Sequence, residues 1–338
     1  MTAKQGFDRR AFLKLAGCAG LAAALPAVSP ALGLAGLTKT LKVAQQNRLL
    51  MGTYVSLTVV DESAARAEDA LIAALSRMES LTPLFDRHDQ AGPLAHLRKQ
   101  GSLNGLSPEL ARVLDLCTQV HRATGGAFDV SVAPLVDAFK QSYAQSQALP
   151  SPQILDEALA AVGGVERTPD GLRLTRPGAG ITLDGVAKGF IVDEGLAAAA
   201  KAGARRALIN AGGDLAVMGD AGAGRPWKVA VSDPEAPSRA KTVIPMTAGG
   251  LATSGSYEVY FDRQRLFHHI INPQSGRSPV TDVSSSVRAP KAALADALST
   301  ACFVMQPAKA VAFLRAQGLN GLIYTRQGQR YATKGFWS

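Results

Sequence analysis

Apolar and polar positions follow two different periods along this chain, and the periods separate strands from helices. In residues 54–60, Val55, Leu57 and Val59 occupy every second position, which predicts a half-buried strand. In residues 63–80 the apolar side chains recur every three to four positions, as on the buried face of an amphipathic helix. The same criteria predict helices over 107–123, 152–161, 186–202, 292–304 and 308–317, and strands over 172–182, 206–210, 227–231 and 243–246.

Local signals fix the ends of several of these elements. Ser107 and Pro108 are residue types preferred at a helix N-cap and at the first helical position, and Gly203 is typical of the position after a helix. The polar stretch 141–150 predicts a loop. Because helices and strands do not alternate strictly, as they would in a doubly wound sheet, the pattern predicts an α+β fold.

The composition allows a large core and narrows the class of ligand. Of the 338 residues, 47% are hydrophobic and 19% charged, so one large domain or two modest ones can fold. The net charge is +9, and because residues 1–35 hold four basic and one acidic side chain, the remainder carries +6. The basic residues are scattered and form no stripe with interleaved aromatics. The sequence therefore favours an anionic small ligand, such as a nucleotide, over nucleic acid.

Residues 1–35 have the organisation of a signal peptide. Arg9 and Arg10 are followed by Phe-Leu-Lys and an Ala-rich apolar stretch that ends in small residues, which predicts twin-arginine export to the periplasm. Pro26 and Pro30 leave the apolar stretch too short and broken for a membrane span. Residues 15–18, Leu-Ala-Gly-Cys, also look like a lipobox, so a lipid anchor on the inner membrane is the minor alternative.

Two cysteines, Cys117 and Cys302, follow the leader. Both lie in apolar runs of predicted helices, which predicts buried thiols. A single disulfide between them stays open as the alternative, because sequence does not show proximity.

Two glycine-containing stretches have a composition that packing does not explain. In residues 124–129, two glycines would let backbone approach a ligand, although an ordinary connection between elements has the same composition. In residues 183–190, Lys188 lies in the first turn of a predicted helix, where its charge opposes the helix dipole unless an anion binds. A solvated lysine is the alternative. The glycine spacing is not that of a P-loop.

Two further stretches offer hydroxyl, imidazole and carboxylate groups. Residues 252–257 are rich in hydroxyls and precede His268 and His269, although histidines in a strand are often only packed. Asp296, Ser299 and Thr300 share one face of an apolar helix. Such oxygen ligands suit Mg²⁺, with capping or back-bonding as the alternative. No CxxC or HExxH pattern is present, which disfavours zinc.

Taken in order, these stretches resemble the ApbE family of FAD:protein FMN transferases. The resemblance rests on Met51-Gly52-Thr53 and on residues 126–129, 187–189, 210–214, 253–255, 269–276 and 295–300. It implies that residues 45–338 form one domain of the ApbE-like fold, with mixed, largely antiparallel sheets and flanking helices.

The resemblance also implies a role for each matching residue. His269 would be the general base and Lys188 would lie beside the FAD pyrophosphate, which makes these two the catalytic candidates. Mg²⁺ would be held by the carbonyl of Gly185 and by Asp296, Ser299 and Thr300. The residues implied in binding FAD are Met51, Phe85, Ala127, Phe128, Asp129, Thr182, Asp184, Lys188, Thr253, Ser254, Gly255, His269 and Ile271.

The implied reaction joins FMN through a phosphoester to a Ser or Thr of an acceptor protein and releases AMP. The implied acceptor is a membrane-associated respiratory or electron-transfer subunit. Three positions depart from the family pattern: Thr182 stands where Asp is usual, with Asp184 two residues later, Phe85 where Tyr is common, and Asn272 where Asp is preferred. An FAD pyrophosphatase and a non-catalytic FAD-binding protein therefore stay open as alternatives.

Overall fold

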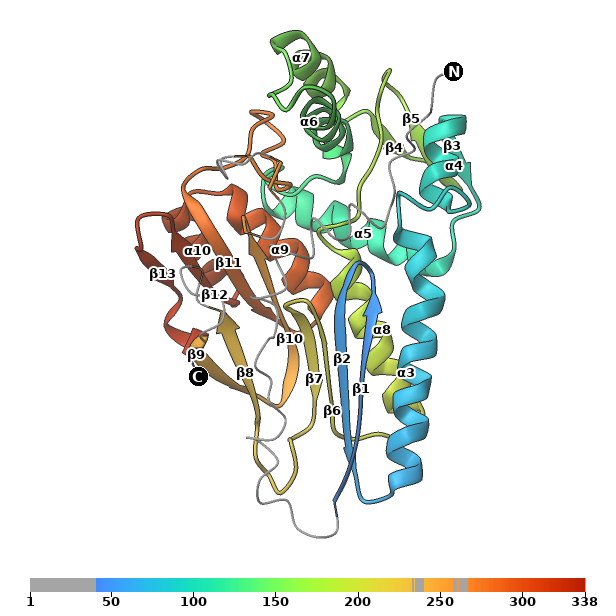
Figure 1. Cartoon of the computed structure of the whole chain (residues 1–338), viewed down its shortest axis with the longest axis vertical. Coiled ribbons are helices and arrows are strands. Elements are labelled where there is room, and N and C mark those ends of the chain that lie inside the picture. Colours follow the sequence, from blue (N-terminus) through green and yellow to red (C-terminus); the bar gives the residue numbers. More distant parts are fainter. Residues whose placement is uncertain (1–40, 233, 235–239, 258–259, 262–266, 338) are drawn as a thin grey trace, which may run out of the picture.

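The computed structural model describes residues 41–232, 234, 240–257, 260–261 and 267–337 (Figure 1). The predicted signal peptide lies outside these residues. Two 3-10 turns, Val130–Val132 and Lys334–Trp337, accompany the longer helices. The helices are α3 (Ala64–Phe85), α4 (Pro93–Gln100), α5 (Pro108–Ala123), α6 (Ala133–Ser146), α7 (Pro152–Ala161), α8 (Ala187–Lys201), α9 (Ala292–Val304) and α10 (Pro307–Ala316).

An eight-stranded sheet forms the centre of the molecule, and all its neighbouring strands are antiparallel. Its strands, in spatial order, are β1 (Lys42–Leu50), β2 (Thr53–Asp61), β6 (Ala207–Ala211), β7 (Asp214–Met218), β10 (Ala248–Gly255), β11 (Asp282–Ala289), β12 (Asn320–Thr325) and β13 (Arg330–Ala332). A small sheet has the order β3 (Ser102–Asn104), β5 (Gly171–Leu174) and β4 (Val165–Arg167), and β8 (Trp227–Ser232) pairs with β9 (Ala240–Met246). This arrangement confirms the predicted α+β fold.

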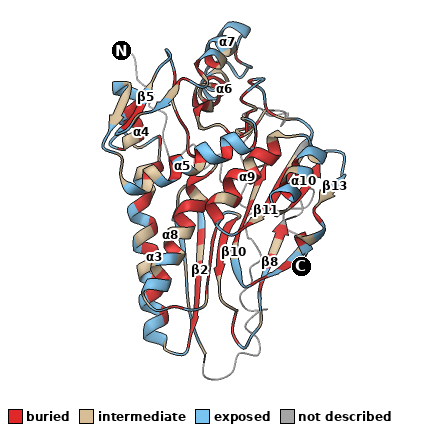
Figure 2. Ribbon diagram, turned by 180° about the vertical axis from the view of Figure 1, so that it is seen from behind, coloured by how far each residue is buried: buried red, intermediate tan, exposed pale blue. Residues whose placement is uncertain are grey.

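The two faces of the central sheet are covered differently. Helices α3, α8 and α9 pack on one face, and the β8–β9 hairpin packs on the other (Figures 1 and 2). Successive side chains of strand β6 point to opposite faces of the sheet. Ile209 packs in the core under the helices, and Leu208 packs in the core under the hairpin. The centre of the sheet is therefore buried on both sides, and the central strands β6 and β7 are buried along almost their whole length.

Several predicted element ends are confirmed. Ser63 caps α3 by accepting a hydrogen bond from the backbone N–H of Arg66, and Ser107 caps α5 through the N–H of Leu110. Helix α3 continues past the predicted end at residue 80 to Phe85, with Pro83 inside its last turn. The helices over 152–161, 186–202, 292–304 and 308–317 lie within a few residues of their predicted bounds.

Two predicted boundaries are wrong. Residues 141–146 continue α6 instead of forming a loop, because Val136 and Phe139 anchor the helix in the core while its last turns face solvent. The strand predicted over 172–182 is confined to Gly171–Leu174. Pro177 and Gly178, which has a positive φ of 72°, end regular pairing there.

Cys117 and Cys302 are both buried free thiols, as predicted. Burial raises the pKa of the Cys117 thiol to about 12, so it is protonated and inert at neutral pH. Within the described part of the chain, no helix is both long and apolar enough to cross a membrane.

Candidate active site

Lys188 stands in the first turn of α8 and forms an ion pair with a buried aspartate. Its Nζ lies 3.0 Å from Oδ2 of Asp214, the first residue of β7. Burial raises the pKa of Asp214, while Lys188 and the backbone N–H of Thr253 oppose that shift. The predicted alternatives for Lys188 were an anion site and a solvated side chain. The structure gives Lys188 an acidic partner inside the protein and leaves its side chain 27% exposed, which is compatible with either alternative.

One face of α9 carries the three predicted oxygen ligands. Oδ2 of Asp296 accepts a hydrogen bond of 3.1 Å from the backbone N–H of Gly189. The Ser299 hydroxyl donates to the Asp296 carbonyl at 2.9 Å and lies 2.7 Å from Ser254 Oγ. The Thr300 hydroxyl lies 3.2 Å from the same Ser254 oxygen. Strand β10 and helix α9 are therefore joined by a hydroxyl network beside the Asp296 carboxylate.

Two glycines let α8 and its preceding loop approach α9 closely. A Cβ on Gly189 would overlap the backbone carbonyl of Ala292, so only glycine allows the N–H of residue 189 to reach Asp296. A Cβ on Gly185 would lie 3.0 Å from Thr300 Oγ1 and 3.4 Å from the Phe128 ring. Gly185, Thr300 and Phe128 are thus immediate neighbours, although they come from three distant parts of the sequence.

The donors gathered here fit Mg²⁺ better than a transition metal. Asp296, Thr300 and the adjacent Gly185 backbone offer hard oxygen atoms, and Mg²⁺ is commonly held by one or two carboxylates together with substrate phosphates. The described residues contain no group of three or more His, Cys, Asp or Glu side chains that could hold a metal by themselves. Ser299 is the least available ligand, since it is fully buried and bonded on both sides.

The stretch 124–129 forms a tight turn after α5. The N–H and hydroxyl of Ser131 both donate to Asp129 Oδ1, at 2.8 and 2.6 Å, and His121 Nδ1 lies 3.6 Å from Asp129 Oδ2. His121 Nδ1 also lies 2.9 Å from the Phe128 carbonyl. These contacts hold Asp129 in place, next to Phe128, whose ring lies beside Gly185.

Thr182 and Asp184 differ in their surroundings. Thr182 is buried, and its N–H donates to the carbonyl of Val130 at 2.8 Å. Asp184 is exposed, and its N–H donates to the Thr182 hydroxyl at 3.3 Å. The carboxylate of Asp184 is therefore in contact with solvent, whereas the side chain at position 182 is a buried hydroxyl.

Three other predicted site residues lie in apolar or turn surroundings. Phe85 is buried in the core, with its ring edge-on to Phe190 at 5.5 Å, and Ile271 belongs to a separate apolar cluster with Leu135 and Phe139. Met51 is in the β1–β2 turn, with a φ of 54° that, followed by Gly52, is typical of a two-residue hairpin.

The two histidines have different environments. His268 is fully buried: its Nε2 lies 2.9 Å from the Pro279 carbonyl, and its ring packs edge-on against Phe303 of α9 at 5.3 Å. The half-buried His269 lies next to His268, with the two imidazole rings edge-on at 6.4 Å. His268 is thus a core residue, and His269 is the more accessible of the two.

Comparison with known proteins identifies the family. A sequence model of the ApbE family matches residues 51–323. The chain belongs to the ApbE family. The FAD:protein FMN transferase of Escherichia coli K12 is 29% identical over 297 residues, or 84% of each chain. The FAD:protein FMN transferase of Treponema pallidum is 30% identical over 295 residues, which cover 79% of this chain and 80% of its own.

Solved structures of ApbE proteins have the same fold. The ApbE protein of Thermotoga maritima is 26% identical, with a TM-score of 0.79, and the match covers 87% of this chain and 98% of that one. The flavin transferase ApbE of Vibrio cholerae, at 22% identity, has a TM-score of 0.77 over 88% of this chain and 98% of its own. The family and fold inferred from the motifs are confirmed.

Two residues in or beside this candidate site were not singled out from the sequence. Asp214 was part of the motif at 210–214, and its position directly after a predicted strand and a Gly-Gly turn was the available signal. No short sequence pattern predicts that Asp214 pairs with Lys188, because the two residues are far apart along the chain. Asp193, in the middle of α8, accepts hydrogen bonds of 3.0 Å from the N–H groups of Ala292 and Ala293 and so holds the start of α9.

Proposed function

We propose that this chain is a Mg²⁺-dependent FAD:protein FMN transferase. Membership of the ApbE family supports transfer of flavin, and the cluster of Lys188, Asp296 and Thr300 supports chemistry at a pyrophosphate. The observation that carries the proposal is the convergence of the Lys188 ammonium and the carboxylates of Asp214 and Asp296 with hydroxyl groups near the start of α8. Cleavage of a pyrophosphate requires positive groups close to its negatively charged oxygens. This cluster provides an ammonium and a site for a cation.

The reaction forms one bond and breaks one. The hydroxyl oxygen of the acceptor bonds to the phosphorus on the FMN side of FAD, and the bond from that phosphorus to the bridging oxygen breaks. AMP leaves with the bridging oxygen, and the hydroxyl proton passes to His269. Lys188 stabilises charge on the phosphoryl oxygens, while Asp214 fixes the position of its ammonium. When bound, Mg²⁺ supplies further neutralisation of that charge.

Transfer and hydrolysis differ in the group that attacks the phosphorus. A water molecule in place of the acceptor hydroxyl would yield free FMN and AMP, so transfer requires that an acceptor docks and water is excluded. We therefore propose a protein hydroxyl, from Ser or Thr, as the physiological acceptor, carried by a membrane-associated electron-transfer subunit. Export by the twin-arginine leader would bring the folded enzyme to such an acceptor in the periplasm.

Intact-mass spectrometry tests the function directly. The mature chain is incubated with FAD, Mg²⁺ and an acceptor domain that bears a Thr, and the same domain with Thr→Ala serves as the control. The proposal expects one added FMN on the Thr domain, none on the Ala domain, and none after EDTA treatment. Free FMN and AMP with an unmodified acceptor would establish a pyrophosphatase instead. Bound, intact FAD would establish a binding protein.

A further inference from the structure

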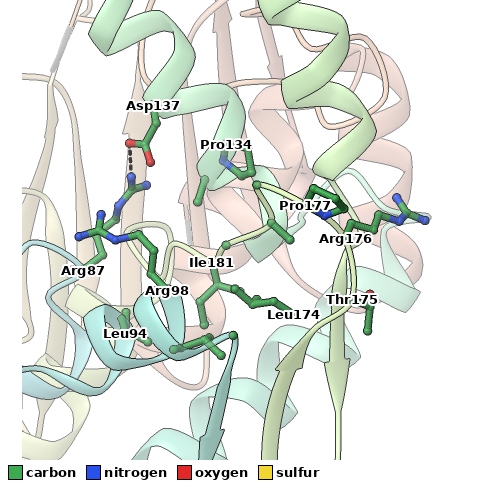
Figure 3. A pocket seen from close by; sticks show the side chains of 16 residues that line it. Arg87, Leu94, Arg98, Pro134, Asp137, Leu174, Thr175, Arg176, Pro177 and Ile181 are labelled. Carbon is green, nitrogen blue, oxygen red and sulfur yellow. Dashed lines mark hydrogen bonds and ion pairs between the residues drawn. The ribbon is translucent and has the colours of Figure 1, made fainter.

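A cavity of about 630 Å³ lies between α4, α6 and the segment 174–181 (Figure 3), and neither Lys188 nor Asp296 lines it. None of its lining residues is among those assigned to flavin or Mg²⁺. Its volume falls in the range of sites for small organic molecules. Leu94 and Ile181 contribute apolar surface, so the cavity can hold the body of such a molecule as well as a charged group.

The charge of the lining is positive and incompletely paired. Arg87, Arg98 and Arg176 line the cavity, and Asp137 is the single acidic residue among the described residues that do so. Asp137 pairs with Nη2 of Arg87. Arg176 donates to the carbonyls of Ala160 and Val162. Arg98 is exposed, and no carboxylate of the described chain lies within ion-pair distance of it.

Arg87 provides the observation that points to a ligand. Its side chain is only 6% exposed, yet its Nη1 has no hydrogen-bond partner among the described residues. A buried guanidinium nitrogen without a partner is costly, and an anionic oxygen is the group that would satisfy it. Figure 3 shows the Arg87 and Arg98 guanidinium groups on the same side of the cavity, where one anionic group could accept from both.

We propose that this cavity binds a small organic anion, with a phosphate or carboxylate group held by Arg87 and Arg98 and an apolar body packed on Leu94 and Ile181. This site is separate from the flavin site and does not depend on the proposed transferase reaction. The segment that forms one wall continues from Ile181 into Thr182 and Gly185, so the two sites are adjacent along the chain.

Isothermal titration calorimetry of the mature chain, without FAD and in EDTA, tests the proposal. Phenyl phosphate and benzoate are the probes, and they distinguish a phosphate from a carboxylate ligand. Phenol, which has the apolar body without the charge, should not bind. Arg98→Gln should weaken binding of the better probe about tenfold, as expected for loss of a charged hydrogen bond. Lys99→Gln is the matched control, because Lys99 is exposed on the same helix and does not line the cavity.

Asp137→Asn gives a result that misfolding cannot imitate. This variant removes the only acidic charge of the described lining while keeping a hydrogen-bond acceptor for Arg87, so it should bind the anion more tightly. Failure of both probes to bind, or equal binding by wild type and Arg98→Gln, would overturn the proposal. Displacement of the probe by saturating FAD would also overturn it, since the cavity would then belong to the nucleotide site. The acceptor assay on the same preparations reports separately on transferase activity.

Discussion

Asp296 is the only carboxylate among the residues we assign to Mg²⁺, so its charge has no substitute there. Asp296→Asn should lower Mg²⁺-dependent AMP release by roughly 100-fold, a typical upper cost of disturbing a metal site. The fold should persist, because the Asn side-chain oxygen can still accept from the N–H of Gly189. AMP release measured across a Mg²⁺ titration tests this, with Asp156→Asn on the exposed face of α7 as the control. Unchanged turnover at low Mg²⁺ would remove Asp296 from the metal site.

His269 should affect the transfer step more than binding. His269→Ala should slow single-turnover transfer by roughly 10²–10⁴-fold, the usual contribution of a general base. The dissociation constant for FAD, followed by flavin fluorescence, should change little, because a base acts on the acceptor hydroxyl. His96→Ala on the exposed side of α4 provides the control. Equal losses in binding and in transfer would assign His269 to flavin binding instead.

At the residue scale, the sequence predicted which side chains share one face of an element better than it predicted their partners from other elements. The spacing of Asp296 and Thr300 places both on one helix face, because helical periodicity is local. The ion pair between Lys188 and Asp214 joins the start of a helix to a strand that begins 26 residues later in the sequence. Only the tertiary fold brings these two side chains together. Likewise, His268 and His269 look equivalent in sequence, and tertiary contacts with Phe303 and the Pro279 carbonyl make the first a core residue.

Among the elements, α9 depends on its neighbour α8 for its N-terminal cap. Lys291, the N-cap residue, makes no side-chain capping bond, and Asp193 of α8 supplies both acceptors instead. Burial raises the pKa of Asp193, which shows that its two hydrogen bonds do not fully offset desolvation. Asp193→Ala should therefore lower the free energy of unfolding by about 1–3 kcal/mol.

Urea unfolding measures this loss, and Asp69→Ala on the exposed face of α3 is the matched control. Because α9 carries Asp296, the same variant should also raise the Mg²⁺ concentration needed for half-maximal activity. A variant with wild-type stability would show that the helix start is held by packing rather than by Asp193.

The start of α3 should give the protein a pH-dependent stability. Asp61 accepts a hydrogen bond of 2.8 Å from the N–H of Ser63 and pairs with Arg66 at 2.5 Å. The Arg66 guanidinium, aided by backbone N–H groups, lowers the pKa of Asp61 below its usual value of 3.8. A lowered pKa in the folded state means that stabilisation is present above pH 3.8 and is lost as the pH falls through the folded-state pKa.

Asp61→Asn should thus lower the urea midpoint at pH 7 and have a smaller effect at pH 3. The contribution is modest, since the Arg66 side chain is 47% exposed and solvent weakens the pair. Midpoints measured for both proteins between pH 3 and pH 7 provide the test. A difference that is constant over this range would mean that the carboxylate charge does not matter.

Element types were predictable where an apolar period is sustained, as in α3 and β2. Residues 141–146 were predicted as a loop because this stretch is polar. They are helical because Val136 and Phe139, earlier in the same helix, anchor it in the core. Strand β11 gave little signal because its central Ser284, Ser285 and Ser286 are hydroxyl residues, yet all three are buried. A buried strand of small polar residues cannot be recognised by hydrophobicity, which is the signal used to find strands.

For the whole molecule, the tertiary fold brings together segments that are far apart in the sequence. The candidate site uses the loop before α8, the start of β7, the end of β10 and one face of α9 (Figure 1). Composition and periodicity predicted the class of fold, but the strand order β2-β6-β7-β10-β11 follows from contacts across long sequence separations. The resemblance to the ApbE family was what linked the motifs to one site, because the family fixes their order along the chain.

Export of the folded enzyme is the remaining prediction at this scale, and it concerns residues 1–35, which lie outside the described structure. Replacement of both arginines, Arg9→Lys with Arg10→Lys, keeps the charge but removes the pair that a twin-arginine signal requires. The precursor should then accumulate in the cytoplasm and the mature chain should be absent from the periplasmic fraction. Lys4→Arg is the control for a conservative change in the same leader. Cell fractionation with immunodetection measures the distribution, and normal export of the double variant would show that the leader uses another route. Labelling with palmitate at Cys18 would instead establish the lipid anchor, which would hold the enzyme at the membrane surface beside its proposed acceptor.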